Sequence, residues 1–378
     1  MKETNQLQVW YEDKKVGTLA LTSDRRVAFE YYDEWLEEGF SISPFSLPLK
    51  KQVFIPTKTY FHGLFGVFAD SLPDAWGNIL LNRMLNEKGI NADKINMLDR
   101  LAIIGNAGMG ALCYRPEKTM IAKDADLDLD YLAGECKKIL ASEYTQELDK
   151  LYQLGGTSGG ARPKILTKID EEEWMIKFPA HVDATNVGKM EYDYSLCAKK
   201  CGILMAETRL FSSDISEGYF GTKRFDRYII NGTCKKVHML TAAALLELDF
   251  EQPSLDYHSL MKLTKILTRD KKQDVEEMFR RMCFNVFAHN RDDHSKNFTF
   301  IYNEKERQWR LSPAYDLTYS NTYYGEHTTT IDGNGKNPGK KELLAVGIAA
   351  GLKKLECENI IEDIYSHVKE DLGDKYGC

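Results

Sequence analysis

A polar run between a predicted helix and a predicted β-hairpin sets the tightest limit on how this chain folds and what it does. The helical pattern over 275–287 ends two residues before the run, which reads Asn290-Arg291-Asp292-Asp293-His294-Ser295-Lys296-Asn297. A hairpin is predicted over 298–311, and Asp316 follows it in the motif Tyr315-Asp316. An Asp and an Asn five positions apart, with a second Asp beyond a hairpin, match the base and metal ligands of a kinase.

The chemistry of phosphoryl transfer assigns a role to each of these residues. A carboxylate must accept the proton of the attacking hydroxyl, and oxygen ligands must hold the magnesium that neutralises the phosphates. We therefore predict Asp292 as the base and Asn297 and Asp316 as magnesium ligands. A solvated charged loop with unrelated carboxylates would explain any one of these residues alone. The ordered set favours the kinase interpretation.

The same hypothesis requires a phosphate-binding loop and a lysine upstream, and both are present in order. The cluster Gly155-Gly156-Thr157-Ser158-Gly159-Gly160 lets backbone N–H groups approach phosphate oxygens. Lys177 lies mid-strand between apolar neighbours, where an anionic partner is needed, and Glu191 on the predicted helix over 186–202 is the carboxylate expected to hold it. A glycine cluster alone is more often a turn, and a strand lysine alone is often an edge charge. The joint order of the three favours an ATP site.

Composition narrows the class of protein further. The 378 residues carry 50 basic and 57 acidic side chains, a net charge of −7, which disfavours direct binding to nucleic acid. Eight cysteines are scattered without a C-x-x-C pair, as in proteins with reduced thiols. The start lacks the order of a signal peptide, and the longest apolar stretch, 345–352, is far shorter than the roughly 20 residues that span a bilayer. We expect a cytoplasmic protein with no membrane contact.

The pattern along the chain predicts three parts. Alternating apolar residues in the first fifty positions predict a small antiparallel sheet, and Asp70 followed by Pro73 predicts the start of a helix. The acidic stretch 124–151 has a weak helical pattern and is interpreted as a connector, and Asp270 is interpreted as the cap of the helix before the polar run. We place the divisions at 1–120, 121–228 and 229–378.

Taken together, these motifs resemble one known family, the HipA serine/threonine kinase toxins of bacterial type II toxin–antitoxin systems. The resemblance covers nearly the whole chain. It is carried by the stretch 61–77 with Leu72-Pro73-Asp74, by Gly155 to Lys164, Lys177-Phe178-Pro179, Glu191-Tyr192, Arg224-Phe225-Asp226-Arg227, Asn290 to Asn297 and Tyr315-Asp316. It implies an α+β, protein-kinase-like two-lobed fold with an N-terminal β-rich subdomain and a helical C-terminal lobe.

The resemblance also implies cofactors, partners and further site residues. ATP and Mg²⁺ would be the cofactors, a translation component such as an aminoacyl-tRNA synthetase the substrate, and a DNA-binding antitoxin the partner through which DNA is reached indirectly. Lys223 to Phe225 would form the adenine-side hinge, and Thr157 or Ser158 would be autophosphorylated. Two departures from the family pattern are Asp293, where Gly is frequent and extra charge beside the metal site is expected, and Lys223, where an acidic residue is frequent.

Two neighbours of the base have open roles, and two other functions remain as alternatives. His294 is expected to fix the loop rather than to relay protons, and Lys296 is expected either to contact the γ-phosphate or to screen the carboxylates. The segment 327–330 is a candidate activation or substrate segment. A small-molecule kinase of the aminoglycoside or choline type shares the Asp-x4-Asn spacing. A co-repressor that binds an antitoxin without catalysis is the third possibility.

Overall fold

The computed structural model describes residues 3–118, 128–181, 183–230, 232–322 and 324–377. Contacts divide the chain into two compact units, and neither is continuous in sequence. The first comprises Met1–Thr185, Phe211–Leu240 and Ala244–Glu247, and the second comprises Asn186–Leu210, Thr241–Ala243 and Leu248–Cys378. The expected boundary near residue 120 lies outside the described residues, and the division at 1–120, 121–228 and 229–378 stays a prediction.

The first unit begins with the antiparallel sheet predicted from the first fifty residues. Its order is β4-β3-β2-β1-β5, so that a strand from beyond residue 110 completes it. The register pairs Val9 with Gly17 on one side and with Tyr114 on the other. The elements of this region are β1 (Gln6–Tyr11), β2 (Lys14–Leu21), β3 (Val27–Tyr31), α1 (Asp33–Glu38), β4 (Val53–Phe54), α2 (Gly66–Ala69), α3 (Ala75–Glu87), a 3-10 turn (Ala92–Lys94), α4 (Met97–Ile104) and β5 (Leu112–Arg115).

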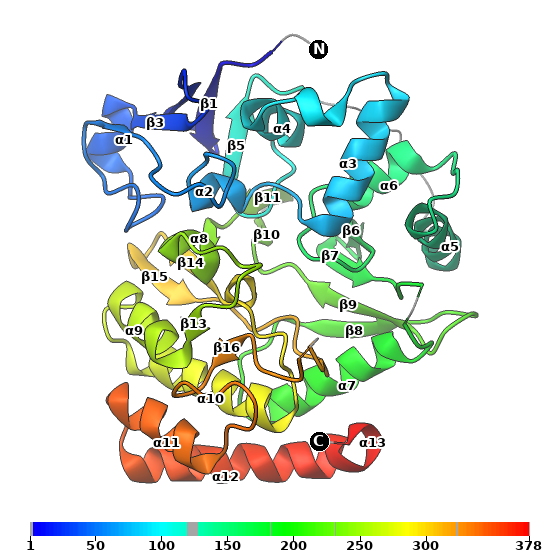
Figure 1. Cartoon of the computed structure of the whole chain (residues 1–378), viewed down its shortest axis with the longest axis vertical. Helices are drawn as coiled ribbons and strands as arrows, with labels where there is room; N and C mark the ends of the chain where they lie inside the picture. The colour runs from blue at the N-terminus through cyan, green and yellow to red at the C-terminus, as the bar shows by residue number, and fades with distance from the viewer. Residues whose placement is uncertain (1–2, 119–127, 182, 231, 323, 378) are drawn as a thin grey trace. The chain divides into compact units, whose positions relative to one another are not determined.

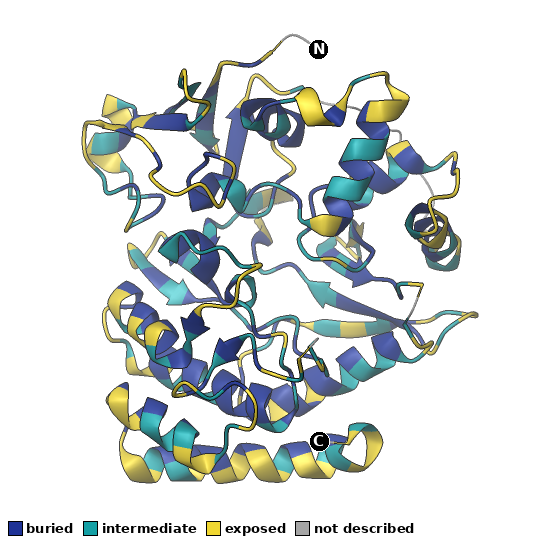
Figure 2. Ribbon diagram, in the orientation of Figure 1, coloured by how far each residue is buried: buried dark blue, intermediate teal, exposed yellow. Residues whose placement is uncertain are grey.

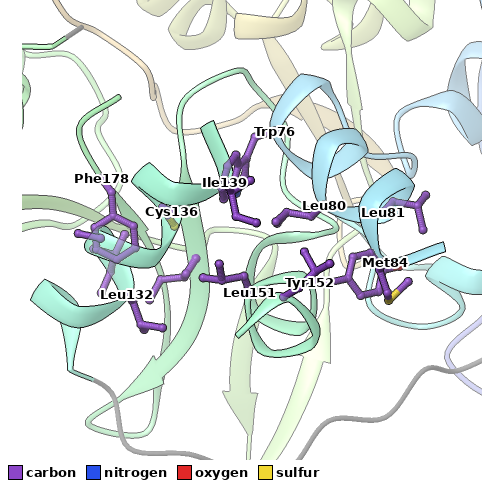
Figure 3. Packing of buried hydrophobic residues seen from close by; sticks show 14 of the residues in the cluster. Trp76, Leu80, Leu81, Met84, Leu132, Cys136, Ile139, Leu151, Tyr152 and Phe178 are labelled. Carbon is purple, nitrogen blue, oxygen red and sulfur yellow. The ribbon is translucent and has the colours of Figure 1, made fainter. Parts of the chain in front are cut away.

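A helical layer, not a polar connector, follows in the first unit. Helices α5 (Leu129–Leu140) and α6 (Leu148–Gly155) bury their apolar sides together with α3 (Figure 3). Trp76, Leu80, Leu132 and Leu151 are all fully buried in this cluster. Where the structure describes it, the weak helical pattern of 124–151 is confirmed, but the connector interpretation was wrong, because both helices pack into the first unit. One of the acidic residues, Glu135, is itself buried.

The remaining strands of the first unit form a hairpin-based sheet. Strands β6 (Lys164–Ile169) and β7 (Glu172–Lys177) pair antiparallel around a turn at Asp170 and Glu171, and β7 also pairs with β9 (Tyr219–Lys223). Both turn residues have positive φ, which suits the tight two-residue turn between twisted strands. A second hairpin, β10 (Arg227–Ile230) and β11 (Thr233–Lys236), follows. The boundary between units runs through β8 (Thr208–Phe211), β12 (Met239–Thr241) and α8 (Ala242–Leu246).

The second unit is mainly helical (Figure 1). Helix α10 is buried along most of its length, whereas α12 exposes much of its surface (Figure 2). The elements are α7 (Val187–Lys200), β13 (Leu255–Asp256), α9 (Tyr257–Leu267), α10 (Lys272–Phe287), a 3-10 turn (Ser295–Asn297), β14 (Thr299–Asn303), β15 (Gln308–Leu311), β16 (Thr329–Thr330), α11 (Lys340–Ala349), α12 (Lys354–Val368), a π-helical turn (Lys369–Gly373) and α13 (Asp374–Tyr376).

Two predicted helix caps are wrong. Asp70 ends α2, and Asp74 takes the N-cap position of α3. Asp270 has a φ of 60° and its N–H donates to the Lys265 carbonyl, so it closes α9, while Lys271 precedes α10. Both acidic residues therefore lie at the end of the preceding helix, not at the start of the following one.

Across the described ranges, no helix is long and apolar enough to cross a membrane. The seven cysteines that the structure describes are free thiols, and Cys378 lies outside those ranges.

Candidate functional site

The glycine-rich loop joins α6 to β6 in the first unit. Helix α6 ends at Gly155, and the Ser158 hydroxyl donates to the Gly155 carbonyl at 2.7 Å. Ser158 is fully buried and Thr157 nearly so. Both hydroxyls therefore face inward in this conformation, and phosphorylation of either would require the loop to open. Autophosphorylation stays a prediction.

The first turn of α3 holds this loop. Asp74 occupies the N-cap position but makes no side-chain cap; its carboxylate accepts the Gly160 N–H at 2.9 Å instead. The Trp76 backbone N–H donates to the Gly160 carbonyl, and the Trp76 indole N–H donates to the Lys164 carbonyl. A side chain at Gly77 would lie 2.8 Å from the Gly156 carbonyl oxygen, so only glycine allows this close approach.

Two lysines face one another beside the loop. Lys164 and Lys177 are register partners on β6 and β7, so their side chains lie on the same face of the hairpin. Both are buried, at 4% and 9% exposure. The Lys164 ammonium donates to the Gly159 carbonyl, and the Lys177 ammonium lies 5.7 Å from the centre of the Phe220 ring. Like charges directly opposite one another on a sheet repel.

Lys164 is a functional candidate that the sequence analysis did not single out. The signal was available in the hairpin itself. A two-residue turn at Asp170 and Glu171 fixes the register that puts residue 164 opposite residue 177.

The motif Arg224-Phe225-Asp226-Arg227 builds a buried ionic cluster in the first unit. The Asp226 carboxylate accepts from Arg224, from Arg227 and from the Gly110 N–H at 2.9 Å. Burial alone would raise the pKa of Asp226, but the two guanidinium groups hold it well below its usual range. Lys223 pairs with Glu172. The cluster fixes the chain next to the proposed hinge, and the adenine contact of Lys223 to Phe225 stays a prediction.

The polar run forms the catalytic-loop candidate in the second unit. Asp292 exposes 57% of its side chain, while Asn290, Asp293 and Ser295 are buried. The Asn297 side-chain amide donates to the Asp292 carbonyl at 2.7 Å, which ties the two ends of the Asp-x4-Asn spacing together. The proposed base is thus the solvent-facing residue of an otherwise anchored loop.

His294 fixes this loop. Its Nδ1 accepts the Lys296 N–H at 3.2 Å, so the proton of the neutral ring lies on Nε2, which is 3.9 Å from the Asp292 carboxylate. The Lys296 ammonium lies 4.4 Å from the centre of the Phe250 ring, a cation–π contact within the second unit. A γ-phosphate contact by Lys296 stays a prediction.

The segment that carries Asp316 is fastened to the catalytic loop. The Tyr315 hydroxyl donates to the Lys296 carbonyl at 2.6 Å, and the Ala314 N–H donates to the Leu204 carbonyl at 2.7 Å. The buried Arg281 guanidinium donates to the Ser312 carbonyl. Asp316 itself has a φ of 58°, an uncommon conformation for a non-glycine residue and one that clusters at functional sites.

Asp293 departs from its expected role. Its carboxylate is fully buried and accepts from Tyr257, His327 and the Thr329 backbone. The extra negative charge expected beside the metal site is therefore matched inside the second unit by three donors. Nothing local in the sequence indicates these partners, since each lies more than thirty positions away.

The predicted residues fall into two sets. The second unit brings together Asp292, Asn297 and the Asp316 segment, and Glu191 is buried there on α7. The glycine-rich loop and Lys177 belong to the first unit, so the pairing of Lys177 with Glu191 stays a prediction.

The chemistry of both sets fits magnesium and ATP. No cluster of three or more His, Cys, Asp or Glu able to hold a metal occurs within the described ranges. A magnesium site would rest on Asp316 and Asn297 and on oxygens from the nucleotide, as magnesium prefers. The lysine pair and the glycine N–H groups suit the phosphates.

Two family models match the chain. The HipA N-terminal domain matches residues 7–115, and the HipA-like C-terminal domain matches residues 156–372. A putative kinase, Y4dM, of Sinorhizobium fredii is 28% identical over 173 residues, covering 42% of this chain and 40% of that relative, so the aligned part spans less than half of the relative's length.

The HipA, HipB and operator DNA complex of Shewanella oneidensis has a chain that superposes with a TM-score of 0.73 at 17% identity, covering 97% of this chain and 90% of that one. This confirms the predicted kinase-like α+β fold with its β-rich N-terminal region and helical C-terminal part.

Proposed function

Because this chain belongs to the HipA family, we propose that it is an ATP- and magnesium-dependent serine/threonine protein kinase that acts as the toxin of a toxin–antitoxin pair. One observation carries the proposal. Asn297 binds the carbonyl of Asp292, and Tyr315 binds the carbonyl of Lys296, so base, amide and second carboxylate lie on two segments joined by hydrogen bonds. This is the residue set that phosphoryl transfer requires.

The residues of the chain divide the work of the reaction. Asp292 faces solvent and can accept the proton of an acceptor hydroxyl, while the hydrogen bond from Asn297 restrains its backbone. Asn297 and Asp316 would hold magnesium, and Lys164, Lys177 and the glycine-rich loop would bind the nucleotide phosphates. Magnesium-bound ATP supplies the transferable phosphoryl group. Holding the acceptor and phosphate in line supplies much of the rate enhancement.

The proposed partners follow from the family and from charge. The Shewanella oneidensis protein was solved with HipB and operator DNA. A net charge of −7 disfavours direct DNA binding by this chain, so we propose a basic, DNA-binding antitoxin as its partner. The proposed substrate is a protein of translation, such as an aminoacyl-tRNA synthetase.

Phosphate transfer from γ-labelled ATP in the presence of Mg²⁺ tests the proposal. We expect label on serine or threonine of an acceptor protein, and a loss of about 10²–10⁴-fold in Asp292→Asn. Asp316→Asn should also lose transfer. Asp332→Asn is the matched control, because Asp332 is in the same unit and its carboxylate pairs with the partly exposed His258.

Three results would overturn the proposal in different ways. Equal labelling by the wild type and Asp292→Asn would remove the assigned base. Transfer to an aminoglycoside or choline but to no protein would make the chain a small-molecule kinase. If the chain binds an antitoxin but shows neither a heat of ATP binding in calorimetry nor phosphate transfer, it would be a co-repressor.

A further inference from the structure

Asp293 is the meeting point of three donors in the second unit. Its Oδ2 accepts from the Tyr257 hydroxyl at 3.1 Å and from His327 Nδ1 at 2.9 Å, and its Oδ1 accepts the Thr329 N–H at 3.1 Å. The Asp293 and His327 side chains are 0% and 2% exposed. A carboxylate buried to this degree is costly unless donors surround it, and here they do.

The polar network continues behind Tyr257. Burial and the neighbouring Asp293 carboxylate raise the pKa of Tyr257, so its hydroxyl keeps the proton that it donates. The Tyr257 oxygen accepts from the Asn285 amide at 2.9 Å, and the Asn285 oxygen accepts from the Asn290 amide at 2.9 Å. Asp293 is thus supported from α9, from α10 and from the start of its own loop.

The segment after Asp316 is bound to the same loop at several points. The Thr329 hydroxyl donates to the Asp293 carbonyl, and the Thr328 N–H and hydroxyl both donate to the Arg291 carbonyl at 3.0 Å. Strand β16 pairs parallel with β13, matching Thr329 with Leu255. Residues 327–330, the candidate activation segment, therefore lie against the backbone on both sides of Asp292.

Arg291 also contacts this segment upstream. Its N–H donates to the Ser320 carbonyl, and its guanidinium donates to the Asn321 side chain. In kinases that are switched on by phosphorylation, new pairs between arginine and a phosphorylated residue order the activation loop. Here a neutral amide already binds the arginine that precedes the proposed base, and a buried carboxylate already fixes the following residues.

We propose that Asp293 is a positioning residue: by binding His327 and Thr329, it fastens the segment after Asp316 to the catalytic loop and sets Asp292 without any phosphate on that segment. This inference rests on the proposed kinase function. It differs from an ordinary buried polar network in its location, since the anchored residue is covalently next to the base. A shift of about 1 Å at a catalytic group can cost about 10²-fold in rate.

The matched pair of variants is His327→Asn and His327→Leu. The asparagine amide can place a donor where His327 Nδ1 lies, whereas leucine leaves Asp293 short of one donor. We expect His327→Leu to lower kcat by about 10²-fold with the KM for magnesium-ATP changed less than about threefold, and His327→Asn to recover most of the rate. Asp293→Asn should behave like His327→Leu. Asp332→Asn, at a partly exposed position just after this segment, should match the wild type.

Hydrogen exchange at the Thr329 amide tests whether residues 327–330 are held by Asp293, and it needs no enzymatic activity. We expect its protection to fall about 10-fold or more in His327→Leu and to be retained in His327→Asn. If the wild type transfers no phosphate, the proposed function fails, but the exchange measurement still shows whether Asp293 holds residues 327–330 in place. Protection and kcat both unchanged in His327→Leu would overturn the positioning role, even if Asp293→Asn does not fold.

A separate measurement tests the claim that the segment needs no phosphorylation. Wild-type protein treated with phosphatase, and shown by mass spectrometry to carry no phosphate on residues 317–330, should keep its full kcat. A requirement for phosphate on that segment would overturn this part of the inference.

Discussion

The two loops that the proposed reaction depends on are held in different ways. The catalytic loop of the second unit is anchored through buried side chains, with Asp293 and Asn290 both below 3% exposure. The glycine-rich loop of the first unit is held mainly through its backbone, by Asp74, Trp76 and Lys164. Four glycines in 155–160 leave that loop more conformational freedom. From this difference we expect the catalytic loop to be preset and the glycine-rich loop to become ordered when a nucleotide binds.

The largest effect is expected at the rigid part of the first unit, next to the proposed hinge. Asp226→Asn leaves the buried guanidiniums of Arg224 and Arg227 without their charge partner, so the free energy of unfolding should fall by about 3–5 kcal/mol. Denaturant unfolding measures this. A loss below about 1 kcal/mol would show that the cluster does not hold this part of the unit.

The same carboxylate predicts a pH dependence. The folded-state pKa of Asp226 is lowered, so its contribution to stability is complete above the unfolded-state pKa of about 3.9. Below that pH the unfolded chain takes up a proton that the folded chain does not, and stability is lost as the pH falls further. The wild type should therefore lose more stability between about pH 4 and pH 2 than Asp226→Asn does. An equal fall in the free energy of unfolding between about pH 4 and pH 2 in the two proteins would contradict this.

A smaller effect is expected in the network behind the catalytic loop. Tyr257→Phe removes the donor to Asp293 and the acceptor of Asn285, and should lower the free energy of unfolding by about 1–3 kcal/mol. Tyr365→Phe, on an exposed face of the same unit, is the control and should change it by less than about 0.5 kcal/mol. Equal losses in both variants would mean that the buried network does not stabilise the loop.

The smallest effect is expected at the glycine-rich loop. Asp74→Ala removes the acceptor of the Gly160 N–H, worth about 1 kcal/mol, so magnesium-ATP should bind roughly 5-fold more weakly. Asp74→Asn keeps an acceptor oxygen and should bind nearly as the wild type does. Calorimetric titration with a non-hydrolysable ATP analogue measures both. Tighter binding by Asp74→Ala would mean that Asp74 competes with the phosphates instead of holding the loop.

Local pattern in the sequence predicted much of both loops. The N-terminal sheet, the hairpin over 298–311 and the Asp292 to Asn297 spacing follow from alternation, turn residues and the order of chemical groups. The contacts that hold these regions in place could not be predicted from local pattern, because they join positions that are distant in the sequence. Asp74 meets Gly160 across 86 residues, and Asp226 meets Gly110 across 116. Asp70 and Asp270 were predicted to begin helices, but each lies at the end of the preceding helix.

Hydrogen exchange on the wild type, with and without a magnesium-bound non-hydrolysable ATP analogue, tests the contrast between the two loops most directly. Ligand should slow exchange across 156–162 by about 5-fold or more and leave the amides of Asn297 and Thr329 unchanged within about twofold. Slower exchange at Asn297 and Thr329 with none across 156–162 would contradict a preset catalytic loop paired with a ligand-ordered phosphate loop.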